Sequence, residues 1–141
     1  MRLQTNRHSV HCLQYHLVVV TKYRKEVINK DINNELVLIA KNIFKVKNTG
    51  KIIEINTDKD HIHILFSVGP QVQLSKLINS FKAVSSRLVR KKFNSYLSAF
   101  YWKPYFWNSS YDIASVGDTN EDVVKRYIQS QGKQKGAPNP T

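Results

Sequence analysis

Alternating hydrophobic and polar positions predict β-strands in three stretches of the chain, because side chains two residues apart share one face of a strand. These stretches are residues 10–21, 51–57 and 61–68. The turn at 58–60 is short enough to join the last two into a hairpin. A fourth strand is expected over 106–116, where the chain is again rich in aromatic and β-branched residues.

Three other stretches carry hydrophobic residues at helical spacing. The first covers 32–43 and is expected to end near 48–50, where Gly50 suits a left-handed helix cap. The second runs from 73 to 93 and places Leu77, Phe81 and Leu88 on one side. A third helix is expected over 119–134, where Asp118 or Thr119 begins a capping-box spacing.

The order of these elements, β-α-β-β-α-β with a final helix, predicts an α+β fold of the ferredoxin-like kind. Such a fold packs its helices on one face of an antiparallel sheet and leaves the other face for a site or a partner. No internal repeat or linker divides the chain. We therefore expect one domain over 1–135 and a flexible tail over 136–141.

Length and net charge limit the classes of partner that this chain can have. The chain has 141 residues, of which 41% are hydrophobic, and its net charge is +12. This surplus of basic residues favours a polyanionic partner, and nucleic acid is preferred over an anionic membrane. The longest aliphatic run, 17–20, is too short to span a bilayer, and no secretory signal is visible. The expected location is the cytoplasm.

The tripeptide His61-Ile62-His63 is the sharpest local motif. On a strand both imidazoles point the same way, about 6.6–7 Å apart along the chain, so one metal ion can bind both. Ile62 and Ile64 take the opposite, apolar face, which places the histidines on the open face of the sheet. A His-x-His tripeptide is common, and two incidental polar residues are the alternative.

Tyr127 and Gln131 are four residues apart and share one face of the last predicted helix. A tyrosine can act as a nucleophile, and a glutamine amide oxygen suits a hard cation. The alternative is that Tyr127 belongs to the core side of that helix with its hydrophobic neighbours.

The predicted helix over 73–93 holds six Lys and Arg and no acidic residue. At helical spacing Lys76, Arg87, Arg90 and Lys91 cluster opposite its hydrophobic stripe. We expect this face to contact nucleic-acid phosphates rather than solvent alone, since such contacts position nucleic acid without reading its sequence.

Six of the eight residues in 100–107 are aromatic. Exposed aromatic rings stack on the bases of single strands, and buried ones fill cores or subunit interfaces. The sequence leaves both roles open for this segment.

In combination these features resemble the single-tyrosine HUH transposases of the IS200/IS605 insertion sequences. The matching stretches, in order along the chain, are 15–24, 60–63, 80–88, 106–117 and 127–131. The resemblance implies that His61, His63 and Gln131 bind a divalent metal ion, Mg²⁺ or Mn²⁺. It also implies that Tyr127 attacks single-stranded DNA and forms a 5′-phosphotyrosine intermediate.

The same resemblance implies a homodimer that recognises DNA hairpins at the ends of an insertion sequence. Whether Tyr127 acts within its own subunit or in the partner's site stays open. Imidazole donors also suit zinc, nickel and copper, so the ion is not fixed.

Two alternatives to this transposase are a domesticated relative that acts on dispersed palindromic repeats and a ferredoxin-like nucleic-acid-binding module without catalysis. An RNA-recognition motif of that second kind would carry aromatic residues on its third strand. Here the strand reads His-Ile-His-Ile-Leu-Phe over 61–66, which counts against this module.

Overall fold

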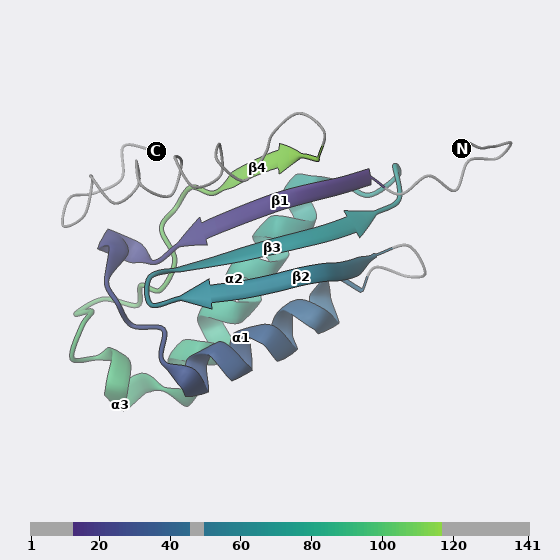
Figure 1. The fold of residues 1–141 in the computed structure, drawn as a ribbon. Coiled ribbons are helices and arrows are strands. Elements are labelled where there is room, and N and C mark those ends of the chain that lie inside the picture. The colour runs from purple at the N-terminus through teal and green to yellow at the C-terminus, as the bar shows by residue number, and fades with distance from the viewer. Residues whose placement is uncertain (1–12, 46–49, 117–141) are drawn as a thin grey trace, which may run out of the picture.

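The computed structural model describes residues 13–45 and 50–116, which form a four-stranded antiparallel sheet in the order β2-β3-β1-β4. Two long helices cover one face of this sheet (Figure 1). The strands are β1 Leu13–Val20, β2 Lys51–Asp58, β3 His61–Val68 and β4 Asp112–Ser115. The helices are η1 Lys22–Arg24, α1 Lys30–Ile43, α2 Leu74–Lys92 and the short α3 Asn94–Leu97. The predicted ferredoxin-like α+β fold is confirmed.

The core lies between the sheet and the two long helices. On β3, Ile62, Ile64 and Phe66 are fully buried, whereas His61 and His63 stay partly exposed. The alternation predicted from the sequence therefore sets which face of β3 meets the helices. The hairpin between β2 and β3 also forms where it was expected.

Helix α1 begins and ends at identifiable contacts. The Asn29 side chain accepts a hydrogen bond from the Ile32 amide at 2.8 Å and caps the N-terminus. The predicted end near 48–50 is wrong, because the helix ends at Ile43 and Gly50 does not cap it. Phe44 follows directly and is fully buried, with its ring centroid 4.7 Å from that of Phe66. Packing of this ring takes precedence over the preference of glycine for a cap.

Helix α2 buries a slightly different stripe from the predicted one. Leu77 and Phe81 are buried, but Leu88 is 37% exposed and Val89 takes its place. Ser85 continues the buried stripe because its hydroxyl donates to the Phe81 carbonyl oxygen at 2.5 Å. The same hydroxyl oxygen accepts from the Trp107 indole at 2.8 Å.

The fourth strand is shorter than predicted. Strand β4 covers only 112–115, and the Val116 amide adds one bond to the Gln14 carbonyl oxygen of β1 at 2.9 Å. Before β4, the expected strand over 106–116 contains the isolated bridge between Thr21 and Trp107. Phe106 and Trp107 pack in the core, and the buried Asn108 amide donates to the Val20 carbonyl oxygen at 2.9 Å. The chain leaves the sheet after this bond and returns at Asp112.

The predicted helix over 119–134, with Tyr127 and Gln131, lies outside the described residues, as does the predicted tail. Among the helices that the structure describes, none is both long and apolar enough to cross a membrane.

Candidate active site

His61 and His63 alternate along β3 with the buried Ile62 and Ile64, so they lie on the face of the sheet opposite α1 and α2, as the sequence predicted. Both residues are partly exposed, so they are neither part of the core nor fully solvated. Within the described residues, no group of three or more His, Cys, Asp or Glu side chains is arranged to hold a metal ion. A metal site built on His61 and His63 therefore needs a further donor that is not a described His, Cys, Asp or Glu side chain.

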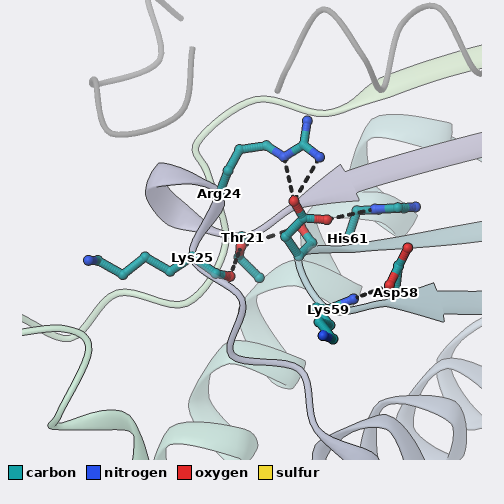
Figure 2. A network of polar contacts seen from close by, with 7 residues as sticks. Thr21, Arg24, Lys25, Asp58, Lys59 and His61 are labelled. Carbon is teal, nitrogen blue, oxygen red and sulfur yellow. Dashed lines mark hydrogen bonds and ion pairs between the residues drawn. The ribbon is translucent and has the colours of Figure 1, made fainter. Parts of the chain in front are cut away.

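Asp60 fixes the orientation of the His61 ring. One carboxylate oxygen, Oδ1, lies 2.9 Å from His61 Nδ1, and both side chains are about 85% buried, at 14% and 16% exposure (Figure 2). Burial acts to raise the pKa of Asp60, but its hydrogen bonds with His61 and Arg24 and the Arg24 charge lower that pKa below its usual value. An ionised carboxylate only accepts hydrogen bonds, so Nδ1 carries the proton. The opposite nitrogen, Nε2, then has the lone pair that a metal ion requires.

Arg24 holds the other oxygen of the same carboxylate. Its Nε and Nη2 atoms lie 2.9 and 2.7 Å from Asp60 Oδ2 (Figure 2). Charge-assisted contacts of this kind are roughly twice as strong as neutral hydrogen bonds. Arg24, Asp60 and His61 thus form one connected row of polar groups across the end of β1 and β3.

The turn that carries Arg24 has an unusual backbone. Tyr23 and Arg24 both have positive φ, 59° and 53°, which non-glycine residues adopt at a cost of about 1–3 kcal/mol each. The Thr21 amide donates to the Asp60 carbonyl oxygen at 2.9 Å, and the Thr21 hydroxyl donates to the Lys25 carbonyl oxygen at 2.7 Å. These bonds hold the strained turn against Asp60. Arg24, one of the two strained residues, is thus also the residue that binds the carboxylate of Asp60 beside His61.

His63 meets a third histidine that the sequence motifs did not reveal. His16 Nδ1 lies 2.8 Å from His63 Nε2, and the two rings are stacked with centroids 5.0 Å apart. One imidazole donates and the other accepts. No spacing in the sequence points to His16, because the pairing of β1 with β3 brings it there. Arg24 and Asp60 lie in the matched stretches 15–24 and 60–63, but the sequence assigned a role to neither.

The predicted DNA-binding residues separate into two places. Arg87, Arg90 and Lys91 line one cavity of about 640 Å³ at the C-terminal half of α2. Lys76 is exposed but lies eleven residues earlier, about 16 Å along the helix axis, and does not line this cavity. The structure therefore brings three of the four together.

The aromatic segment at 100–107 contains both kinds of side chain that the sequence allowed. Tyr101, Phe106 and Trp107 are buried in the core. Trp102 is 82% exposed and Phe100 is 37% exposed. Base stacking is thus open only to the second group and to the half-buried Tyr105.

A ferredoxin-like sheet with an oriented histidine pair on its open face defines the class of HUH-type proteins. The family model described as "Transposase IS200 like" matches residues 9–131, which is most of the chain. The chain belongs to this family of transposases, whose members cut DNA, and the predicted relationship to the IS200/IS605 group is confirmed.

Two curated relatives agree with this assignment. The chain is 29% identical over 133 residues to the ISDra2 transposase TnpA of Deinococcus radiodurans, covering 93% of this chain and 92% of that protein. It is 26% identical over 132 residues to the transposase of insertion sequence IS200 from Salmonella typhimurium, covering 90% and 86% of the two chains.

Solved structures share the fold. A crystal structure from Deinococcus radiodurans R1, assigned as a transposase, superposes with a TM-score of 0.78 at 26% identity over 92% of this chain and 98% of that one. A REP-associated tyrosine transposase bound to a REP hairpin gives a TM-score of 0.52 at 9% identity, over 90% of this chain and 68% of that one. The second comparison supports the fold alone.

Proposed function

We propose that this transposase cuts and rejoins single-stranded DNA through Tyr127. The phenol oxygen of Tyr127 forms a bond to the phosphorus of a phosphodiester and loses its proton. The bond from phosphorus to the 3′ oxygen breaks, and that oxygen takes up a proton. One product is a 5′-phosphotyrosine, and the other is a strand with a free 3′-hydroxyl. A later 3′-hydroxyl reverses these steps and joins two strands without ATP.

The oriented His61 ring is the observation that carries this proposal. Its Nδ1 proton is bound by Asp60 and its Nε2 lone pair is left for a ligand, which is the usual arrangement of a metal-binding histidine. The donors fit a divalent cation when Gln131 adds an amide oxygen to His61 and His63. We assign these three residues as the ligands of Mg²⁺ or Mn²⁺.

The bound cation would polarise a phosphoryl oxygen and neutralise charge that develops during the displacement. The protein side chains supply the rest. Arg24 and Asp60 keep His61 in one tautomer, and the contact between His16 and His63 restrains the second imidazole. The basic residues of α2 hold the DNA backbone, because phosphate contacts set the position of a strand.

We further propose that the DNA is a hairpin at the end of the mobile element and that the chain acts as a homodimer. The family assignment supports both points, and the net charge of +12 supports the DNA partner. A binding module without catalysis would need the same basic surface. It would not need a histidine whose proton is held by a buried carboxylate.

The test is a reaction of the purified protein with single-stranded DNA from the flanks of its own gene, with Mg²⁺. We expect a protein–DNA adduct that survives denaturation. His61→Ala and His63→Ala should each abolish the adduct while hairpin binding stays close to that of the natural protein. Cutting by either variant at the natural rate would contradict the metal assignment.

A further inference from the structure

The cavity at the C-terminal half of α2 is lined by cations and aromatic rings. Its four cationic side chains are Arg87, Arg90, Lys91 and Lys103, and among the described residues that line it there is no Asp or Glu. We call it the basic pocket. Its volume of about 640 Å³ falls in the range of about 300–1,000 Å³ that is usual for small-molecule and cofactor sites.

Three rings form the aromatic side of the basic pocket: Tyr101, Trp102 and Tyr105. Tyr101 is fixed, because its hydroxyl donates to the Lys22 carbonyl oxygen at 2.7 Å and its ring meets Tyr105 edge-on at 6.1 Å. Trp102 is 82% exposed, with Lys103 Nζ 4.7 Å from its ring centroid. A large exposed indole beside a fixed aromatic wall is a ready platform for stacking.

The basic pocket lies at the same end of the sheet as the histidines. The turn η1 follows β1 there, and the segment after α3 runs beside it (Figure 1). Lys22 binds this segment through its amide, which donates to the Phe106 carbonyl oxygen at 2.9 Å, and through its Nζ atom, 5.0 Å from the Tyr105 ring centroid. Two residues later, Arg24 reaches Asp60 beside His61. The turn η1 thus links the segment that lines the pocket with the residues that orient His61.

We propose that the basic pocket binds an unpaired nucleotide of the DNA strand that the transposase cuts. The cations of α2 bind its phosphate, and Trp102 stacks on its base. This inference rests on the proposed function, since it assumes a DNA strand at the histidines. Paired bases are stacked inside a duplex and cannot use the rings, and an acidic peptide would use only the cations. The combination selects a nucleotide with a free base.

The two tryptophans of the chain allow a direct test. Trp107 is 7% exposed and packs in the core, so a bound base would change the fluorescence of Trp102 alone. We would titrate the full-length protein with single-stranded oligothymidylate, with a duplex of equal length and with polyglutamate. We expect strong quenching by the single strand and much weaker quenching by the other two. Equal quenching by the duplex or by polyglutamate would overturn the proposal.

The variants Trp102→Ala and Phe100→Ala form a matched pair. Both remove an exposed ring from the same segment, but Phe100 does not line the basic pocket. Stacking contributes enough that Trp102→Ala should weaken binding of the single strand by about 5- to 150-fold and leave duplex binding unchanged. Phe100→Ala should bind both as the natural protein does. Unchanged single-strand affinity in Trp102→Ala would refute the stacking role.

The adduct assay separates this inference from the proposed function. Trp102→Ala should form the covalent adduct only at higher DNA concentrations than the natural protein, because the variant loses stacking affinity but keeps the groups that carry out the chemistry. Quenching of Trp102 in a protein that forms no adduct would support the pocket and contradict the transposase mechanism. An adduct formed with full affinity by Trp102→Ala would support the transposase mechanism and contradict the role of the pocket.

Discussion

Replacing Asp60 by alanine should weaken metal binding without unfolding the protein. The substitution removes three short contacts, two with Arg24 and one with His61 Nδ1. His61 keeps its own donor atom but loses the carboxylate that fixes its tautomer and the direction of the ring. The change therefore tests orientation rather than loss of a ligand.

The expected size of the effect follows from those contacts. Loss of a carboxylate that orients a metal-binding histidine typically lowers metal affinity by about 10- to 100-fold. That corresponds to about 1.4–2.7 kcal/mol of binding free energy at 25 °C. Direct loss of His61 should remove detectable binding. Asp60→Ala should therefore fall between the natural protein and His61→Ala.

Manganese binding is the suitable assay, because the electron paramagnetic resonance of free Mn²⁺ reports affinity without any need for cleavage. Asp31→Ala is the matched control, since it removes one carboxylate from the exposed first turn of α1. The ¹⁵N resonances of His61 should show a proton fixed on Nδ1 only while Asp60 is present. Equal Mn²⁺ affinity in Asp60→Ala and Asp31→Ala, with an unchanged tautomer, would refute the reasoning.

Three further predictions concern α2. Neutralising Arg87, Arg90 and Lys91 together should reduce the salt dependence of DNA binding by about one unit of slope per lost phosphate contact. An unchanged slope would mean that these three side chains contact only solvent. Burial lowers the pKa of Lys82 from 10.5 to about 8, so the unfolded state binds more protons between these values and stability should rise with pH there. Urea unfolding of Lys82→Met should show a smaller rise of stability with pH. An unaltered rise would mean that Lys82 does not cause the pH dependence. Ser85→Ala leaves the buried Trp107 indole without its acceptor and should cost about 1–3 kcal/mol of unfolding free energy, whereas a cost equal to that of Ser86→Ala would exclude this role.

The sequence alone predicted the three long strands and the face of the histidine pair, because alternation along a strand is a local property. Ile62 and Ile64 had to face the helices, and this fixed His61 and His63 on the other side. The order of elements then left the ferredoxin-like sheet as the natural arrangement.

The sequence-based predictions failed where packing between distant segments determines the end of a helix or its buried face. Helix α1 stops at Ile43 because Phe44 packs against Phe66, and no cap residue signals this end. Val89 is buried in place of the predicted Leu88. The buried stripe of α2 can pass through Ser85 to Val89 because the Ser85 hydroxyl is hydrogen-bonded inside the core.

The groups that orient the histidines were also beyond local patterns. His16 and Arg24 reach the site only through the pairing of β1 with β3 and through a turn with positive φ. Tyr127 and Gln131 lie outside the described residues, and their roles stay predictions.

The central claim is that Tyr127 is the nucleophile, and one measurement tests it most directly. The natural protein and Tyr127→Phe would each be incubated with single-stranded DNA from the flanks of the gene and Mg²⁺, then denatured, digested and mapped by mass spectrometry. Phenylalanine keeps the ring and removes only the hydroxyl that can form a phosphoester. The account predicts a phosphotyrosine–DNA peptide at Tyr127 in the natural protein and no adduct in the variant, which should still bind the DNA. An adduct that persists in Tyr127→Phe, or that maps to Tyr105 or Tyr111, would contradict it.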